Sequence, residues 1–167
     1  MAELWDILDK LGNKTGRLHE RGKDMQPNDY HLIVEVWIRN SAGEFLLSKR
    51  APDRGDCWHT TCGCAITGDD SLSAAVREAQ EELGVTLAPS EGRFFKRKVE
   101  PKRSGPGNVI VDTWLFCQEV DISKLTLCPV EISDAMWISK QELIKMSNDG
   151  INCQYNYLED FFNFCDL

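Results

Sequence analysis

One helix constrains the fold of this chain more than any other segment, because it combines a buried stripe with an unusual concentration of carboxylates. It lies within residues 63–85, which read GCAITGDDSLSAAVREAQEELGV. Asp70 or Ser71 suits the N-cap position and Gly84 suits the residue just past the C-terminus, so the pattern predicts a helix over 72–83. The apolar side chains recur at spacings of four, three and four residues, typical of one buried face: Leu72, Val76, Ala79 and Leu83.

Three glutamates fall in the second half of this helix, at an edge flanking the predicted buried stripe: Glu78, Glu81 and Glu82. Like charges four residues apart on an exposed helix repel by roughly 0.2–0.5 kcal/mol. Anions near a helix C-terminus also oppose the macrodipole by about 0.3–1 kcal/mol each. Arg77 is the cation available locally to offset these costs. Helix geometry alone leaves two explanations open, a solvated acidic face or a bound divalent cation that takes oxygen ligands.

The spacing around the helix resembles the Nudix box. That family pattern is a glycine, five residues, a glutamate, seven residues, and then Arg-Glu-aliphatic-any-Glu-Glu-any-Gly-aliphatic. The chain departs from it in two places, with Ala79 in the aliphatic slot and Asp69 in place of the glutamate. The side chain of Asp69 is one methylene shorter than that of glutamate, so it is open whether its carboxylate reaches the partner that the family's glutamate contacts. The neighbouring Asp70 could partly substitute for it. The positions that correspond to the pattern, with Asp69 in the glutamate slot, are Gly63, Asp69, Arg77, Glu78, Glu81, Glu82, Gly84 and Val85.

The flanking segments EFLLSKR and DAMWIS also resemble strands of Nudix domains, so the resemblance covers roughly residues 30–146. It implies an α/β fold, a Nudix-type α/β/α sandwich with a mixed β-sheet. A chain of 167 residues has the length of one domain. We therefore expect a single Nudix domain over 1–167.

The resemblance also implies a reaction. Nudix hydrolases cleave a pyrophosphate linkage in a nucleoside diphosphate joined to another group, by attack of metal-activated water on phosphorus. Carried over by position, Arg77 holds the catalytic glutamates in register through charge-assisted hydrogen bonds. The ligands of Mg²⁺ or Mn²⁺ are then the side chains of Glu78, Glu81 and Glu82 and the backbone carbonyl of Gly63 or its neighbour Cys62.

Residues outside the box complete the candidate site. The family places its general base either in the box or on a distant loop, and Glu131, just before the DAMWIS strand, is the candidate from outside. Arg50 closes the EFLLSKR strand, and with Lys49 and Arg54 it is a candidate for binding phosphate oxygens of the substrate. No segment offers a base-reading or sugar-reading motif, so the substrate's identity stays open.

Two other functions remain as alternatives. Isopentenyl diphosphate isomerases share the Nudix fold, and residues 31–62 resemble theirs, with a histidine opening the strand and Cys62 in the loop before the helix. In that family the cysteine and a later glutamate move protons on an alkene. Here Cys64 stands where those enzymes have a metal-binding histidine, and their later acidic motif is reduced to Asp112. The second alternative is a noncatalytic Nudix module that binds nucleotides without turnover.

Charge and composition narrow the partners. A net charge of −8 argues against nonspecific binding of nucleic acid or membranes, so we expect a small-molecule nucleoside diphosphate derivative. The chain has no long apolar run and no basic-then-apolar start, which predicts a cytoplasmic protein with reduced thiols. The spacing of the clustered soft ligands does not match structural zinc sites: Cys57, His59, Cys62 and Cys64.

The remaining elements follow from turn signals and periodicity. Residues from about 3 to 20 predict a β-hairpin, which is a candidate contact for a homodimer, and residues from about 153 to 165 predict a C-terminal amphipathic helix. The strand over 31–39 alternates, with its even-numbered residues from Leu32 to Ile38 on one face, and Trp37 on the other face either stacks on a base or packs under another layer. Further strands are predicted over 44–50, 60–66, 93–99, 109–120 and 134–139, with a capping box for a short helix after Ser139.

Overall fold

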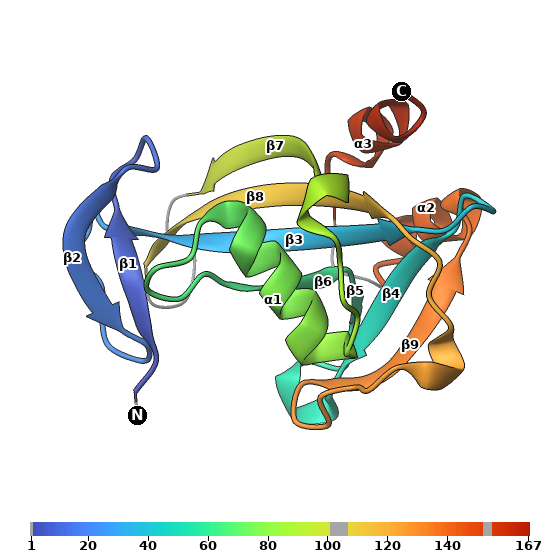
Figure 1. Cartoon of the computed structure of the whole chain (residues 1–167), viewed down its shortest axis with the longest axis horizontal. Helices are drawn as coiled ribbons and strands as arrows, with labels where there is room; N and C mark the ends of the chain where they lie inside the picture. Colours follow the sequence, from blue (N-terminus) through green and yellow to red (C-terminus); the bar gives the residue numbers. More distant parts are fainter. Residues whose placement is uncertain (1, 101–106, 152–154) are drawn as a thin grey trace.

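A mixed β-sheet with β3 at its centre organises the protein (Figure 1). The computed structural model describes residues 2–100, 107–151 and 155–167. β3 pairs in parallel with β8 over ten positions and antiparallel with β6, while β4 pairs antiparallel with β5 and β9. The strands in this part of the chain are β1 (Leu4–Leu8), β2 (Lys14–Glu20), β3 (Tyr30–Arg39), β4 (Phe45–Arg50), β5 (Trp58–His59), β6 (Thr61–Cys64), β7 (Arg93–Glu100), β8 (Asn108–Cys117) and β9 (Ile132–Ile138).

Helices cover both faces of the sheet, which confirms the predicted α/β sandwich. The predicted inward face of β3 packs against α1 (Ser71–Leu83). The other face packs against α2 (Lys140–Asn148) and α3 (Leu158–Cys165). Short 3-10 turns η1 (Pro52–Arg54), η2 (Pro89–Glu91) and η3 (Ile122–Lys124) lie in the connections. In the described residues no helix is long and apolar enough to cross a membrane.

The ends of α1 agree with the sequence prediction within one residue. Asp70 is the N-cap, and its carboxylate accepts a hydrogen bond from the backbone of Ser73 at 2.7 Å, while the Ser73 side chain caps Asp70 in return. Gly84 ends the helix with a φ of +70°, in the left-handed region that favours glycine. Asp70 is therefore used as a cap and does not replace Asp69 in the site.

The buried face of α1 is rotated from the predicted stripe. Leu72 and Val76 are only half-buried, whereas Glu78 and Glu82 are buried. Three alanines cause this difference, because their small side chains let the helix lie close to the sheet, and the two glutamates are buried as a result. They are Ala74, Ala75 and Ala79.

The C-terminal helix is shorter than predicted. Residues 153 and 154 lie outside the described part of the chain, and α3 begins only at Leu158. Tyr155 precedes it outside regular secondary structure, and its hydroxyl accepts the backbone N–H of Thr60 at 2.8 Å.

Trp37 packs in the core and is closed to any ligand. Its exposed fraction is 0%, and its indole N–H donates to the Tyr157 hydroxyl at 3.2 Å. It also contacts Phe161 of α3, with ring centroids 5.0 Å apart. The possibility that Trp37 stacks on a base is therefore excluded.

The N-terminal hairpin of β1 and β2 lies where the sequence predicts one and extends the sheet beyond β3 (Figure 1). Trp5 of β1 stacks on His31 of β3, with ring centroids 4.4 Å apart. Arg17 of β2 donates to the carboxylate of Asp29 at 2.9 Å. Ring stacking and this ion pair fix the hairpin against the start of β3.

The N-cap of α1 gives a stability test. Asp70→Ala removes the acceptor of the Ser73 backbone N–H, and we expect it to lower the free energy of unfolding by about 1 kcal/mol in urea denaturation. Asp149→Ala, at an exposed aspartate after α2, serves as the control. Equal stability of the two variants would contradict the role given to the capping box.

Candidate active site

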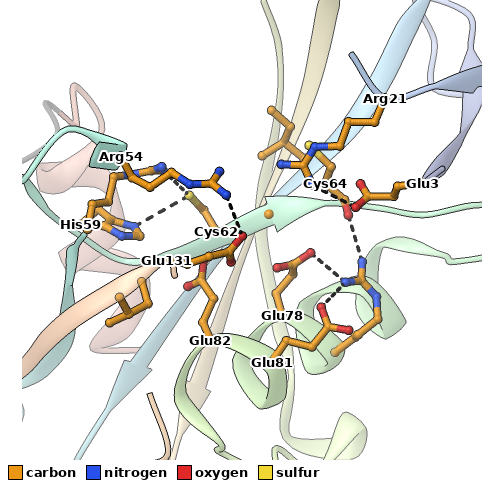
Figure 2. A pocket seen from close by; sticks show the side chains of 15 residues that line it. Glu3, Arg21, Arg54, His59, Cys62, Cys64, Glu78, Glu81, Glu82 and Glu131 are labelled. Atoms are coloured by element: carbon orange, nitrogen blue, oxygen red, sulfur yellow. Dashed lines mark hydrogen bonds and ion pairs between the residues drawn. The ribbon is translucent and has the colours of Figure 1, made fainter. Parts of the chain in front are cut away.

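A cavity of about 270 Å³ lies where the second half of α1 meets β6, the end of β4 and the N-terminal hairpin (Figure 2). Most residues predicted for the site line it: Arg50, Arg54, Gly63, Arg77, Glu78, Glu81, Glu82 and Glu131. Lys49 does not line it, and its ammonium instead pairs with Asp56 at 2.9 Å.

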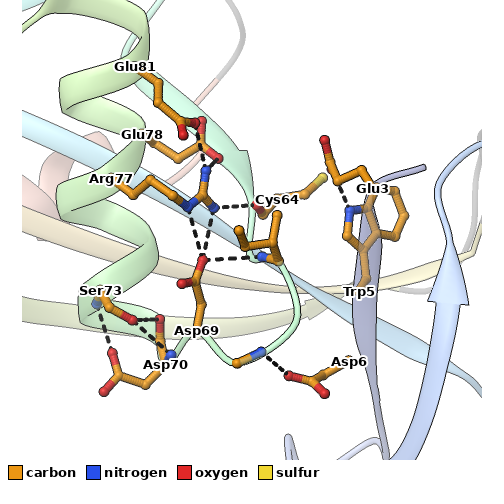
Figure 3. Close-up of polar contacts among 12 residues, drawn as sticks. Glu3, Trp5, Asp6, Cys64, Asp69, Asp70, Ser73, Arg77, Glu78 and Glu81 are labelled. Carbon is orange, nitrogen blue, oxygen red and sulfur yellow. Dashed lines mark hydrogen bonds and ion pairs between the residues drawn. The ribbon is translucent and has the colours of Figure 1, made fainter. Parts of the chain in front are cut away.

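Arg77 is the centre of the polar contacts around α1 (Figure 3). Its Nε and Nη2 both donate to Oδ2 of Asp69, at 3.1 and 2.9 Å. Nη2 also donates to the backbone carbonyl of Cys64 at 2.9 Å. Nη1 donates to Glu78 at 2.9 Å and to Glu81 at 2.8 Å. One guanidinium therefore holds two glutamates and the loop that leads into the helix.

The shorter side chain of Asp69 reaches Arg77 despite the missing methylene. The same Oδ2 atom also accepts the backbone N–H of Ile66 at 3.2 Å, which draws the loop toward the helix. The carboxylate is thus tied both to the box arginine and to the backbone before it. The aspartate departure from the family pattern leaves this connection in place.

Gly63 is required by the close approach of Glu78. A Cβ built on Gly63 would overlap the carboxylate of Glu78, and because that carboxylate ends a flexible side chain, the side chain would have to move away from β6. The carboxylate of Glu78 therefore rests directly on the backbone of β6, and any larger residue at position 63 would displace it.

Glu82 is the most buried acid of the cluster. Only 4% of the residue is exposed, and its Oε2 has no hydrogen-bond partner among the described residues. Burial, followed by the charge of Glu78, raises the pKa of Glu82 to about 8. Burial also raises the pKa of Glu78 to about 7, against the lowering effect of Arg77. Two adjacent carboxylates are therefore costly to ionise here.

Glu81 differs from the other two glutamates. Its side chain is 57% exposed and pairs with Arg77 at the rim of the cavity. Across the described ranges, no three histidine, cysteine, aspartate or glutamate side chains converge on one point as a preformed metal site. This holds for the three glutamates and also for the cysteine and histidine cluster considered for zinc.

Cations face the glutamates from the opposite wall. Arg54 of η1 lies 3.7 Å from Glu131, and both line the cavity (Figure 2). Arg50 donates from Nη2 to the sulfur of Cys62 at 3.2 Å, and its charge lowers the pKa of Glu82. The cavity thus combines buried carboxylates with guanidinium groups, an arrangement that suits a metal ion and phosphate together.

Several residues of the lining were not among the predicted site residues, and they include His59, Glu3 and Arg21. His59 lies 3.8 Å from the sulfur of Cys62, and burial, followed by the charge of Arg50, lowers its pKa to about 4. Glu3 and Arg21 come from the N-terminal hairpin and form an ion pair of 2.9 Å. The clustering of His59 with cysteines was a signal in the sequence, whereas no local pattern links the hairpin to the box.

Comparisons with known proteins identify the family of the chain. The NUDIX domain profile matches residues 29–161. An uncharacterised Nudix hydrolase of Listeria monocytogenes is 34% identical over 166 residues, which cover 96% of this chain and 94% of the relative. An isopentenyl-diphosphate Delta-isomerase of Cutibacterium acnes is 24% identical over 153 residues, covering 84% and 76%.

Solved structures share the fold. A crystal structure of a Deinococcus radiodurans protein has a TM-score of 0.71 at 18% identity, covering 94% of this chain and 96% of the other. The NUDIX domain of NrtR from Shewanella oneidensis, complexed with ADP ribose, has a TM-score of 0.59 at 15% identity, covering 78% and 82%. The matched profile and the full-length relative together show that this chain belongs to the Nudix family and is a Nudix hydrolase.

Proposed function

We propose that the protein is a metal-dependent hydrolase that cleaves the pyrophosphate linkage of a nucleoside diphosphate joined to another group. The observation that carries this proposal is the unpartnered Oε2 of Glu82, buried beside Glu78 in a cavity that guanidinium groups face. An unsatisfied buried carboxylate oxygen is costly, and a divalent cation would satisfy it.

The residues fit such an ion. Mg²⁺ and Mn²⁺ prefer oxygen ligands, and Mg²⁺ usually binds one or two carboxylates together with substrate phosphates and waters. Glu78 and Glu82 supply two buried carboxylates, and Glu81 lies at the rim of the cavity. The backbone carbonyl oxygen of Gly63 or Cys62 is the proposed further ligand of the ion. When bound, the ion would lower the pKa of water and neutralise charge on the diphosphate.

The protein's own residues position the substrate and the reacting groups. Arg77 fixes the carboxylate of Glu78, and Gly63 leaves room for it. Arg50 and Arg54 face the acids and would bind phosphate oxygens. The ion pair of Arg54 with Glu131 is long and partly exposed, so phosphate can replace it and leave Glu131 as a general base.

The comparisons support the substrate class. A NUDIX domain of the same fold has ADP ribose bound, which is a nucleoside diphosphate joined to a sugar. The full-length Listeria relative carries the name of a Nudix hydrolase, with no substrate stated.

Hydrolysis of a substrate panel tests the proposal. Incubation with nucleoside diphosphate sugars, dinucleoside polyphosphates and ADP ribose, with Mg²⁺ or Mn²⁺, should release phosphate-containing products from at least one compound, and a chelator should stop the release. Glu82→Gln should lower kcat at least a hundredfold, because the amide replaces a metal-binding carboxylate. Phosphorus NMR or chromatography of the products provides the measurement.

Glu91→Gln, at an exposed glutamate of η2, is the matched control and should keep wild-type activity. If every compound survives intact while one of them binds, the protein is a noncatalytic module and the proposal fails. A fully active Glu82→Gln variant would refute its role as a ligand.

The buried acids also predict how stability depends on pH. The pKa values of Glu78 and Glu82 rise from 4.5 to about 7 and about 8 in the folded protein, so the folded state binds more protons than the unfolded chain in this window. The free energy of unfolding is therefore highest, as far as these two acids affect it, below pH 4.5, where both are protonated in the folded and the unfolded state. It falls as the pH rises to about 8, by an amount on the order of a few kcal/mol.

Thermal unfolding without divalent metal therefore should show a melting temperature that falls from pH 5 to pH 8. Glu82→Gln should flatten this profile, and Mg²⁺ should raise the wild-type melting temperature more at pH 8 than at pH 6, because it binds the ionised form. A Glu82→Gln profile parallel to that of the wild type would contradict this assignment of the buried charge.

One observation favours a second candidate. Cys62 lies in the cavity beside Arg50 and His59, and isopentenyl diphosphate isomerases are among the relatives. A proton shuttle on an alkene would require the thiol, so Cys62→Ala would abolish isomerisation of isopentenyl diphosphate. If the protein is a hydrolase, Cys62→Ala should keep at least a third of the wild-type kcat/KM for hydrolysis. Parallel assays of isomerisation and hydrolysis decide between the two functions.

A further inference from the structure

A second cavity, of about 590 Å³, adjoins the candidate active site at the N-terminal hairpin. The two cavities share Arg21, Ile33 and Cys64. Ile33 and Cys64 are paired residues of β3 and β6, so their side chains lie on the same face of the sheet. The two cavities therefore meet over this pair, and we refer to the second one as the hairpin cavity. Its volume is within the range of small-molecule sites.

The hairpin cavity has an apolar wall and a charged rim. Trp5 of the hairpin, Ile33 of β3 and Val109 of β8 form the wall. Arg21 and Lys23 lie at the rim, and Arg21 is held by Glu3 at 2.9 Å at the boundary with the active site (Figure 2). The profile match begins at residue 29, so the hairpin, which contributes Trp5 to this wall, lies outside the shared domain.

A buried acceptor in this wall lacks a donor. His31 is 2% exposed and stacks on Trp5, and its Nδ1 has no hydrogen-bond partner in the part of the chain that the structure describes. Burial, with the charge of His19, lowers the pKa of His31 to about 4, so its imidazole is neutral near pH 7. A neutral imidazole nitrogen without a donor can accept a hydrogen bond from a ligand group that reaches it.

We propose that the hairpin cavity binds the nucleoside of the substrate, while Arg21 binds the phosphate next to it. This inference rests on the proposed hydrolase function and deepens it. A nucleoside has a flat ring that packs on apolar walls and polar edges that can donate hydrogen bonds, and its phosphates would lie across Arg21 toward Glu78 and Glu82. The hairpin therefore determines which diphosphates the enzyme accepts.

Binding of non-hydrolysable probes tests this inference without turnover. Calorimetric titrations with Mg²⁺ compare methylenediphosphonate with the α,β-methylene diphosphates of adenosine and cytidine, which carry the same diphosphate with a nucleoside added. At least one nucleoside probe should bind the wild type tenfold more tightly than methylenediphosphonate. Val109→Phe, which fills the hairpin cavity, should remove that advantage and leave methylenediphosphonate binding unchanged.

Arg21→Gln should weaken all three probes about tenfold, since a phosphate loses a charged hydrogen bond. Lys10→Gln, at an exposed lysine in the turn of the hairpin and outside both cavities, is the matched control and should bind as the wild type does. If Val109→Phe does not fold, Val109→Leu is the smaller insertion in the same wall, and it should reduce the advantage of the nucleoside probes and leave methylenediphosphonate binding unchanged.

The inference is overturned if no nucleoside probe binds more tightly than methylenediphosphonate, or if Val109→Phe affects all probes equally. These outcomes are separate from a failure of the proposed function. Intact nucleoside binding with no hydrolysis of any panel compound would refute the hydrolase alone, and hydrolysis with binding unaffected by Val109→Phe would refute the nucleoside site alone.

Discussion

The hydrogen bonds of Arg77 connect the parts of the molecule that form the candidate site. One guanidinium, with 21% of its side chain exposed, contacts Asp69 in the loop, the carbonyl of Cys64 at the end of β6, and two glutamates of its own helix. Charge-assisted bonds of this kind are roughly twice as strong as neutral ones. They fix α1 in rotation about its axis and along its length relative to β6, and the positions of the buried acids follow from that.

The same placement makes the site electrostatically unfavourable, because it buries two carboxylates next to each other. The alanines of α1 bring the helix close enough to bury Glu78 and Glu82, and Gly63 leaves the space that the first of them fills. Close packing usually excludes charged groups from the interior, but here it buries two carboxylates, and this lowers the stability of the fold near neutral pH. Larger apolar residues at these positions would hold the helix farther from the sheet and leave its carboxylates in solvent.

Local features of the fold could be predicted from the sequence. The bounds of α1, the alternation of β3 and the capping box at Ser139 depend on neighbouring residues, and all three match the structure. The burial of the glutamates could not be derived from helix periodicity, because it depends on how closely alanine side chains let the sheet approach. The part that the hairpin plays in both cavities was also inaccessible, since Arg21 reaches the box only through tertiary packing of β1 on β3.

The parallel pairing of β3 with β8 bears on the order in which the molecule assembles. Partners such as Glu35 and Thr113 are separated by 78 residues in the chain, so a large loop must close before these strands meet. Such long-range pairing slows folding, because chain entropy is lost before the contacts compensate for it. The sequence motif on α1 is contiguous, yet its acids are buried only where β6 lies against β3. A peptide containing the motif alone would therefore be a solvated acidic segment, and ligand recognition would emerge as a late property of the folding chain.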